Sequence, residues 1–275
     1  MTPAPGLDTE KQRIEQEFHD RWARSMDLSG LLVDEAFEAC TAMENRFAFE
    51  ALSPVAGKRI LDLGCGAGET SVYFAKKGAA VVAVDISPEM VSVGQRLADK
   101  HGVKVDFLTA VAERLPFPDG HFDAVFGNGV LHHVELIPAL KEIRRVLKPG
   151  GRAAFIEPLK HNPVIELYRR LAADNRTPTE FPLGFSDFER MREVFPSLWH
   201  REFWLFTLYL FVHFFVFERA SPGKVRYWKK VIEDAPKYER LFRALKALDD
   251  AVLRCFPFLG RLCWNSVLLA RKEDL

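Results

Sequence analysis

The sequence of 275 residues has no excess of charge of either sign, because 38 Lys and Arg balance 38 Asp and Glu. No run of basic residues is longer than two, so the pattern typical of nucleic-acid-binding surfaces is missing. The first residues, MTPAPGLDTEKQRIEQEF, contain no apolar stretch of the kind found in secretory signals. We therefore expect a cytoplasmic protein that does not bind nucleic acid.

Cysteine is scarce as well. Cys40, Cys65, Cys255 and Cys263 are scattered and form no CxxC or Cys/His group with the spacing of a metal site. This distribution favours reduced thiols, as in the cytoplasm, and we expect no bound metal. With 48% hydrophobic and 28% charged residues, the chain has the balance of an ordinary globular protein.

Long hydrophobic runs are absent with one exception, FWLFTLYLFVHFFVF at residues 203–217. Its fifteen residues carry no charge, yet a membrane-spanning helix needs about twenty apolar residues. We therefore expect no transmembrane segment. REFW is predicted to end a strand, and LFTLYLFVHFFVFERA to form a helix that pairs in a hairpin with the amphipathic stretch after Pro236.

Three interpretations of this hairpin remain open. In the first it is only a helical layer packed on the core. In the second it lines a pocket for a hydrophobic small molecule. In the third it makes peripheral contact with a bilayer, where RYWKK at residues 226–230 offers an aromatic and basic patch.

Between residues 58 and 158, short apolar segments rich in Val, Ile and Phe alternate with helical segments. The apolar segments do not alternate strictly with polar residues, which is typical of parallel strands covered on both faces. Ligands of such open α/β sheets bind at the carboxyl ends of the strands. The predicted strands are KRILDLG, VVAVDIS, VDFLTAVA, FDAVFGN and RAAFIEP, followed later by LWHREFW and CWNSVLLARK.

Helical segments flank this core. One amphipathic helix is predicted from Asp8 to about Ser25, and a second from about residue 33 to 52. YRRLAADNR and SDFERMREVF are predicted helices, the second capped by Ser186. We expect an N-terminal helical cap at residues 1–52, a core at 53–204, a hydrophobic hairpin insertion at 205–261 and the final strand of the core at 262–275.

The segment LDLGCGAG, at residues 61–68, places three glycines at the end of the first predicted strand. Glycine lets the backbone approach a ligand closely, and the amides of the next helix point to the same place. Asp85 stands 21 residues after Gly64, where a carboxylate can accept hydrogen bonds from a ribose. The pattern predicts an adenosine-containing ligand. Glu69 occupies the third-glycine position of a dinucleotide fingerprint, which disfavours a pyrophosphate.

Four segments in order, ILDLGCGAG, VDIS, AERLPFPDGHFDAVFGNGVLHHV and RVLKPGG, resemble the class I S-adenosylmethionine-dependent methyltransferases, in particular their small-molecule, type 11-like branch. The resemblance covers about Arg59 to Pro158, over a third of the chain. It implies an α/β fold with a Rossmann-like, mostly parallel seven-stranded sheet, helices on both faces, an N-terminal helical cap and a C-terminal helical insertion. It also implies S-adenosylmethionine as the cofactor and S-adenosylhomocysteine as its product.

The resemblance further assigns residues to the cofactor. The glycine loop would contact the methionine moiety, Asp62 its amino group and Asp85 the ribose. Val111 departs from the family, because many relatives have an acidic residue there that binds the adenine amino group. Adenine recognition is therefore expected to rest on backbone contacts. The expected cofactor-binding residues are Asp62, Gly64, Cys65, Gly66, Gly68, Asp85, Ile86, Ala112, Glu113 and Asn128.

Two adjacent histidines, His132 and His133, follow the fourth predicted strand on the ligand side. Histidine has an ordinary pKa close to neutral pH, so either ring is a candidate base for removing a proton from the methyl acceptor. A structural role for these rings is the alternative.

Four other residues are predicted to contact the acceptor. Glu157 and His161 follow the fifth strand, where capping of the loop is the alternative role. His19 and Trp22 lie on the first helix, which in relatives often folds over the substrate, and plain packing is the alternative for Trp22.

The sequence thus predicts methyl transfer from S-adenosylmethionine to a small, hydrophobic acceptor: a lipid-like molecule, a quinone or an aromatic metabolite. Oxygen is favoured as the accepting atom. Two alternatives stay open. One is a protein that binds the cofactor without turnover and acts through its hairpin, and the other is an NAD-dependent oxidoreductase.

Overall fold

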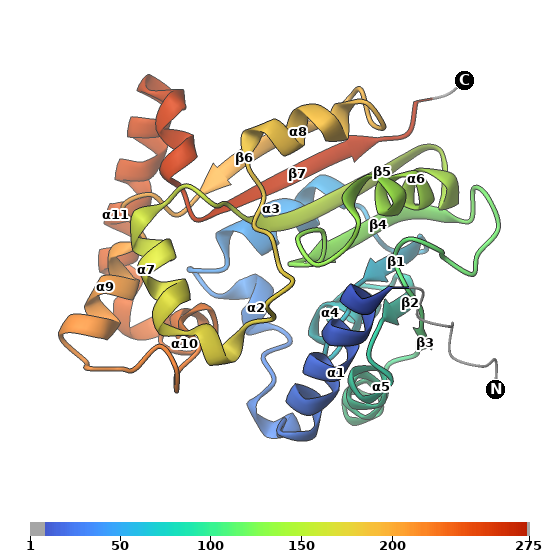
Figure 1. Ribbon diagram of the computed structural model, residues 1–275, viewed down its shortest axis with the longest axis horizontal. Coiled ribbons are helices and arrows are strands. Elements are labelled where there is room, and N and C mark those ends of the chain that lie inside the picture. Colours follow the sequence, from blue (N-terminus) through green and yellow to red (C-terminus); the bar gives the residue numbers. More distant parts are fainter. Residues whose placement is uncertain (1–8, 274–275) are drawn as a thin grey trace.

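Seven strands form one sheet in the computed structural model, which describes residues 9–273 (Figure 1). Their order is β3-β2-β1-β4-β5-β7-β6; β1 to β5 pair in parallel, and β7 is antiparallel to both of its neighbours. The predicted mostly parallel α/β sheet is confirmed. The strands are β1 (Arg59–Leu63), β2 (Ala80–Asp85), β3 (Val105–Thr109), β4 (Phe122–Asn128), β5 (Leu147–Pro158), β6 (Trp199–Phe203) and β7 (Asn265–Arg271).

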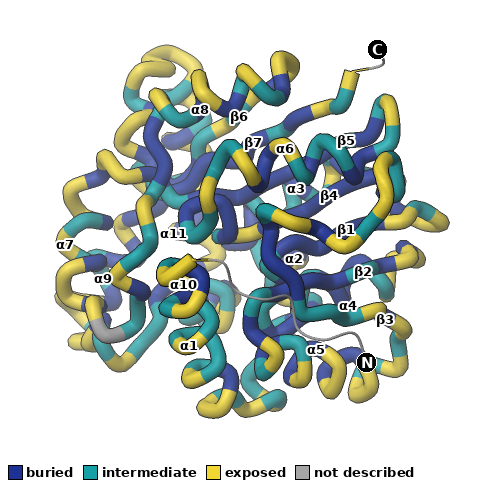
Figure 2. Tube along the Cα trace, turned by 45° about the vertical axis from the view of Figure 1, so that its right-hand side comes forward, coloured by how far each residue is buried: buried dark blue, intermediate teal, exposed yellow. Residues whose placement is uncertain are grey.

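Helices cover both faces of the sheet, because successive residues of a strand point to opposite sides. Ile60 packs in an apolar core with α3, α4 and α5, whereas its neighbour Leu61 packs in a second core with α6 and α8. The central strands β1, β4, β5 and β7 are therefore buried from both sides, whereas the edge strands β3 and β6 are partly exposed (Figure 2). These helices are α3 (Met43–Leu52), α4 (Glu69–Lys76), α5 (Pro88–His101), α6 (Leu136–Val146) and α8 (Phe185–Arg192).

The N-terminal helix α1 (Glu10–Arg24) is tied to the loop that follows β2. The Gln16 side-chain amide donates to the backbone carbonyl of Ile86 at 3.1 Å, and the Ser87 hydroxyl donates to the Asp20 carboxylate at 2.5 Å. The predicted helix is confirmed, although its expected first residue, Asp8, lies outside the described residues. Because β2 ends at this loop, α1 covers the carboxyl edge of the sheet, where ligands are expected.

The predicted single helix over residues 33–52 is wrong. The chain forms a short helix α2 (Glu35–Glu38), turns at residues 39–42, and then forms α3. The turn is held by side chains that bond backbone carbonyls instead of continuing a helix. The Asn45 amide donates to the carbonyl of Ala36, and the Thr41 hydroxyl donates to that of Val231 at 2.9 Å.

The helix cap predicted at Ser186 is also wrong. α8 begins at Phe185 and is capped by Gly184, whose backbone N–H donates to the Asp187 carboxylate at 2.9 Å. The helix before it, α7 (Pro163–Leu171), begins earlier than predicted, because Asn162 caps it by accepting hydrogen bonds from two backbone amides.

The predicted hairpin after β6 contains three helices instead of two: α9 (Tyr209–Val216), α10 (Tyr227–Glu233) and α11 (Ala235–Cys255). The chain leaves β6 at Trp204, which has a φ of 71°. The buried Asp249 carboxylate of α11 then accepts hydrogen bonds from the backbone amides of residues 205–207, which delays the start of α9. Arg219, with a φ of 53°, lies in the loop after α9.

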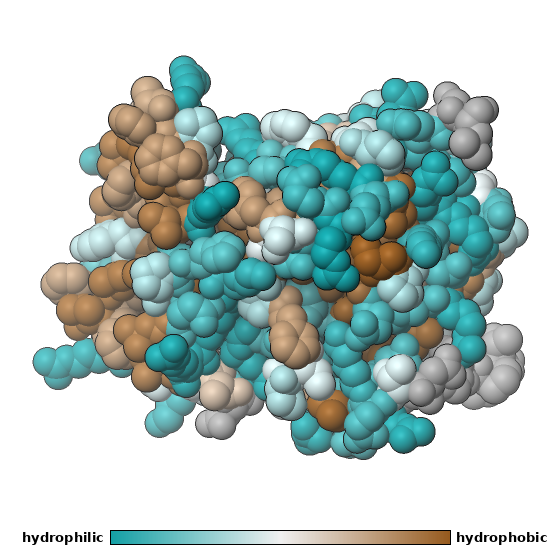
Figure 3. Space-filling view, turned by 45° about the horizontal axis from the view of Figure 1, so that its top comes forward, coloured by the Kyte–Doolittle hydropathy of each residue, from teal (hydrophilic) through white to brown (hydrophobic). Residues whose placement is uncertain are grey.

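The phenylalanine-rich run is buried on one side only. Phe211 and Phe214 are fully buried in the first core, together with Trp204, whereas Phe215 and Phe217 are exposed. Figure 3 shows apolar side chains gathered on the side of the molecule that α7, α9 and α11 form in Figure 1. Within residues 9–273, no helix combines the length and the apolar character needed to cross a bilayer.

Candidate active site

A cavity of about 690 Å³ lies at the carboxyl ends of β1, β2, β4 and β5, between α1, α7 and α10. Every expected cofactor-binding residue except Gly68 lines it, and so do both candidate catalytic histidines, His19 and Trp22. Glu157 and His161 do not line it. The lining residues expected for the cofactor are Asp62, Gly64, Cys65, Gly66, Asp85, Ile86, Ala112, Glu113 and Asn128.

The glycine loop leaves room where a side chain would intrude. Gly66 has a φ of 52°, and a Cβ built on it would meet nothing within 4 Å, so its free face opens on the cavity. Gly68 has a different role, because a Cβ there would lie 2.9 Å from the Cα of Gly94 in α5. The third glycine therefore serves close helix packing, and a ligand would contact the first part of the loop.

The Asp85 carboxylate fixes the glycine loop by a hydrogen bond. One of its carboxylate oxygens accepts the backbone N–H of Gly66 at 2.8 Å, and the other accepts that of Ser87 at 2.9 Å. A carboxylate oxygen can accept more than one hydrogen bond, so both oxygens keep capacity for the hydroxyls of a ribose. The geometry fits the role expected for Asp85, and the adenosine moiety of S-adenosylmethionine fits this end of the cavity.

Asp62, at the end of β1, is almost completely buried. Burial raises the pKa of its carboxyl group to about 7, and the charge of Asp85 adds to this effect, although a hydrogen bond from the Ser71 hydroxyl at 2.5 Å opposes it. A bound cation would favour the ionised form. Asp62 therefore fits an ammonium group such as that of the methionine moiety.

Glu113 has a role that the sequence did not indicate. Its carboxylate accepts the backbone N–H of Glu135 at 2.9 Å and a hydrogen bond from the Gln12 side chain at 3.3 Å. It thus joins α1 to the loop after β4. With the bond from Gln16 to Ile86, it holds α1 over the end of the cavity where the adenine is expected.

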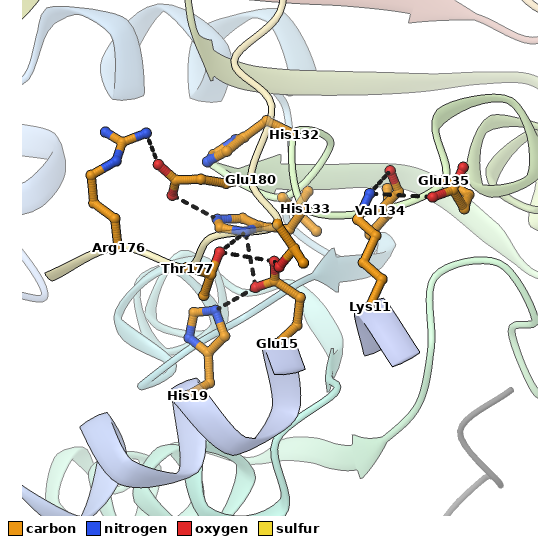
Figure 4. Close-up of polar contacts among 12 residues, drawn as sticks. Lys11, Glu15, His19, His132, His133, Val134, Glu135, Arg176, Thr177 and Glu180 are labelled. Carbon is orange, nitrogen blue, oxygen red and sulfur yellow. Dashed lines mark hydrogen bonds and ion pairs between the residues drawn. The ribbon is translucent and has the colours of Figure 1, made fainter. Parts of the chain in front are cut away.

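His133 belongs to a buried polar network (Figure 4). Its Nδ1 lies 3.0 Å from the Glu15 carboxylate, which also accepts hydrogen bonds from the hydroxyls of Thr177 at 2.8 Å and Thr179 at 2.5 Å. Burial alone would raise the pKa of Glu15. The contacts with His133, which are the strongest, and with the two threonine hydroxyls outweigh burial and lower this pKa to about 2. Burial and the neighbouring His132 lower the pKa of His133, so its ring is neutral near pH 7 and able to take a proton.

His132 is bound differently. Its Nδ1 lies 2.7 Å from one oxygen of Glu157, whose other oxygen accepts the backbone amides of Val130 and Leu131. Burial, together with the charge of Arg176, lowers the pKa of His132 to about 3. Glu157 therefore holds the turn after β4 in place, which agrees with the loop-capping alternative. The contact of His132 with its carboxylate, at 2.7 Å, is shorter than that of His133 with Glu15, at 3.0 Å.

His19 and Trp22 lie nearer the cofactor end than expected. The Asp85 carboxylate is close enough to act on the pKa of His19, which burial lowers overall, and Trp22 packs in a small cluster with Ala67 of the glycine loop. His161 is exposed, so the structure does not bring it into the cavity.

Arg226 does not belong to an outward-facing basic patch, which one of the three open interpretations placed at residues 226–230. It lines the cavity, and its guanidinium stacks on the Trp22 ring, 3.6 Å from the ring centroid. Tyr227, the next residue, is fully buried. Sequence reasoning missed Arg226 and Glu15; the position of Glu15 one helical turn before His19 was a usable signal, whereas nothing local marked Arg226.

Glu15, His19 and His133 bring three potential metal-binding atoms within 4.8 Å of one another. The Glu15 carboxylate is already occupied by His133 and two threonine hydroxyls. Hydrogen bonding accounts for this grouping, and we assign no metal to it.

Comparison with known proteins places this geometry in a family. A family model described as a methyltransferase domain matches residues 61–155. A demethylmenaquinone methyltransferase of Clavibacter sepedonicus is 47% identical over 44% of this chain and 48% of its own length. A ubiquinone/menaquinone biosynthesis C-methyltransferase UbiE of Hahella chejuensis is 30% identical over 69% of this chain and 78% of its own. The chain spans about half the length of the first curated relatives it matches.

Solved structures share the fold. A phosphoethanolamine N-methyltransferase 2 of Haemonchus contortus, in complex with phosphomonomethylethanolamine and S-adenosylhomocysteine, superposes with a TM-score of 0.61, at 19% identity over 94% of this chain and 60% of its own. A methyltransferase of Haloferax volcanii in complex with its Trm112 activator gives 0.60, at 16% identity over 93% and 98% of the two chains. At these identities the likeness concerns the fold alone.

Proposed function

This chain belongs to the class I S-adenosylmethionine-dependent methyltransferases, and from that premise we propose that it methylates a ring carbon of a quinone-type aromatic acceptor in its reduced, hydroquinone form. The observation that carries the proposal is one cavity that joins the glycine loop and Asp85 to the His133–Glu15 pair. A cofactor site and a proton acceptor thus face the same space.

The walls of the cavity favour an aromatic acceptor. Tyr168 and Ile165 of α7 line it, and Trp264 lines it from the segment before β7. Such apolar walls with a few polar groups are typical of sites for small molecules. The interpretation of the helical insertion as a pocket wall is supported for α10, which contributes lining residues, but not for α9 or α11, which contribute none.

The expected preference for oxygen as the accepting atom is not supported. Relatives that match this chain are named demethylmenaquinone methyltransferases and ubiquinone/menaquinone biosynthesis C-methyltransferases, and the second name specifies carbon. An NAD-dependent reaction is not favoured either, because the half-buried Glu69 carboxylate lines the cavity at the start of α4, where a pyrophosphate would have to lie.

The chemistry is a displacement. When bound, S-adenosylmethionine supplies an electrophilic methyl group, whose bond to sulfur breaks as the bond to the ring carbon forms. The ring carbon becomes nucleophilic when a ring hydroxyl loses its proton, and His133, held by Glu15, is placed to accept that proton. The proton on the methylated carbon then moves to the oxygen as the ring becomes aromatic again, so each transfer releases one proton in all.

The test uses methyl-labelled S-adenosylmethionine and a 1,4-naphthalenediol with an apolar side chain and hydrogen on the adjacent ring carbon, kept reduced. The control acceptor already carries a methyl group on that carbon. We expect label in the organic phase with the first acceptor only, and carbon NMR should identify an aryl methyl group.

Two results would contradict the proposal. A methoxy carbon in the NMR spectrum would return the accepting atom to oxygen. No label with either acceptor, while S-adenosylhomocysteine still binds, would favour a cofactor-binding protein without turnover.

A further inference from the structure

Three arginines line the cavity, and they differ in their partners. Arg169 forms an ion pair with Glu166, and Arg176 forms one with Glu180. Among the side chains that the structure describes, Arg226 forms no ion pair with a carboxylate and no side-chain hydrogen bond; its guanidinium contacts the Trp22 ring. One of the three cavity arginines is therefore not compensated by any described side chain.

The charge of Arg226 lowers the stability of the fold unless a ligand supplies the opposite charge. Burial lowers the pKa of Arg226 to about 10, so the group still carries its charge at neutral pH. A partly buried charge without a partner destabilises a fold, and such groups occur mainly where a ligand supplies the opposite charge. Stacking on Trp22 holds the guanidinium plane and leaves its N–H groups free to donate within that plane.

The surroundings place Arg226 between the two halves of the cavity. Trp22, beneath it, packs near the glycine loop, and Tyr168, whose hydroxyl is close enough to act on the pKa of Arg226, belongs to the acceptor wall. His19, on which Arg226 also acts, lies in the network of Glu15 and His133. A ligand group beside Arg226 is thus close to the reacting centre.

We propose that Arg226 binds an anionic oxygen of the ligands in this cavity. Two sources share this chemistry: the phenolate that an aromatic acceptor forms when it loses its hydroxyl proton, and the carboxylate of the methionine moiety. The first source rests on the function proposed above, whereas the second does not. In the first case Arg226 stabilises the ionised acceptor, so that His133 removes a proton from a more acidic hydroxyl.

The first arm of the test measures ionisation of 1-naphthol, whose absorption spectrum changes when it becomes naphtholate. It is titrated with pH while bound to the protein loaded with S-adenosylhomocysteine. If Arg226 faces the acceptor, the pKa of bound 1-naphthol lies below its value in water, and Arg226→Met returns it to or above that value. Arg226→Lys, which keeps the charge, should retain most of the effect.

The second arm measures binding of two cofactor analogues by calorimetry. S-adenosylhomocysteine has the carboxylate, and 5′-methylthioadenosine has neither the carboxylate nor the amino group. If Arg226 faces the cofactor, Arg226→Met weakens binding of the first by about tenfold or more and leaves the second unchanged. Lys224→Met is the matched control, because Lys224 is exposed, lies outside the cavity and precedes the same helix.

Either arm moving as described supports the proposal and identifies the anion. The proposal is overturned if folded Arg226→Met changes neither the pKa of bound 1-naphthol nor the affinity for S-adenosylhomocysteine. An equal loss of affinity for both cofactor analogues also overturns it, because such a loss indicates loosened packing. If Arg226→Met does not fold, the same comparison is made with Arg226→Gln, which keeps donor groups without the charge. If no label is transferred to the naphthalenediol but either measurement changes in Arg226→Met as described, the proposed function is refuted and the anion-binding role of Arg226 is retained.

Discussion

At the cofactor end of the cavity, the backbone of residues 64–66 and the carboxylates of Asp62 and Asp85 form the surface. At the acceptor end, side chains from α7 and α10 form it together with Glu15 of α1. The first set lies within a short stretch of chain and is held by hydrogen bonds between near neighbours. The second set is joined by contacts across more than a hundred residues, such as that from Thr177 to Glu15. The same cavity is thus built from local structure at one end and from long-range packing at the other.

This difference predicts how each end responds to substitution. A change at the cofactor end should act on binding of S-adenosylmethionine with little effect on the insertion. A change at an insertion residue that does not line the cavity should act on stability, while the cofactor affinity of the folded protein stays constant. The predictions below test this separation, from the largest expected effect to the smallest.

The largest effect is expected inside the helical insertion. Phe214 is fully buried in the first core, whereas Phe217, three residues later, is 65% exposed. Phe214→Ala should lower the free energy of unfolding by about 3–5 kcal/mol, because it removes a large side chain and leaves a cavity. Phe217→Ala, the matched control, should change it by less than about 0.5 kcal/mol. Denaturant unfolding measures both.

Cofactor affinity in the same two variants tests the separation itself. Calorimetry with S-adenosylhomocysteine, under conditions where the variants are folded, should give values within about twofold of wild type, because neither ring lines the cavity. A large loss of affinity in Phe214→Ala would show that the insertion also supports the cofactor end.

The contrast explains how much the sequence could predict. Gly64, Gly66 and Asp85 stand at fixed spacings after two strands, because the loop and the strand ends alone create their geometry. The parallel pairing of the first five strands follows from the alternation of strands and helices. The motif could not separate Gly68, which meets Gly94 of α5, from the glycines that face the ligand, because that contact depends on how two helices pack.

The acceptor end offered no such regularity. Arg226 looked like part of a surface patch, and only the placement of α10 against α1 turns it toward Trp22. The turn at residues 39–42 was missed because the hydrogen bond from Thr41 to Val231 joins residues 190 positions apart. A helical period says which residues share a face, but it does not say which distant element covers that face.

The second prediction concerns Asp85. Asp85→Ala should weaken binding of S-adenosylmethionine by about 100-fold or more, because charge-assisted hydrogen bonds to a ribose are lost together with the bond that holds Gly66. Asp106→Ala is the matched control, since Asp106 is an exposed acid on the neighbouring strand β3. Calorimetric affinities decide it, and unchanged binding in Asp85→Ala would refute the ribose assignment.

The third prediction separates the two histidines. His133→Ala should lower kcat by about 100-fold, the effect of losing a general base, while the affinity for S-adenosylhomocysteine stays the same. His132→Ala should act mainly on stability, because it leaves the buried Glu157 without its ring partner. Full turnover in both variants would exclude proton removal by this pair.

The pH dependence of kcat sharpens the assignment to His133. Burial lowers its pKa from 6.5, and the groups that face it are His132, Glu15, His19, Thr177 and Glu180. The neutral ring is the active form of a base. The wild-type kcat should therefore be constant above neutral pH and decrease only below pH 6.5, and the residual activity of His133→Ala should not show that decrease.

The smallest effect is expected for Asp62→Asn, which links stability to cofactor binding at one residue. The pKa of Asp62 is about 7 in the fold and 3.8 without it, so between these values the folded protein binds more protons than the unfolded chain. The contribution of Asp62 to the free energy of unfolding therefore decreases as the pH rises through this window. Because Asn carries no charge, the variant without cofactor should be more stable than wild type at pH 8, by about 1 kcal/mol or more.

The same variant should bind S-adenosylmethionine more weakly, because it lacks the carboxylate that fits the ammonium group. The advantage in stability should become small near pH 4, where the folded wild type is neutral at this position, and it should decrease when saturating cofactor is added. Thermal unfolding of both proteins at pH 4 and pH 8, with and without S-adenosylmethionine, measures the difference in stability and its dependence on pH and on cofactor, and calorimetry measures the affinity. If Asp62→Asn were less stable than wild type at pH 8, the buried carboxylate would be compensated by the protein itself. The buried charge of Asp62 would then not need the ammonium group of the cofactor to balance it.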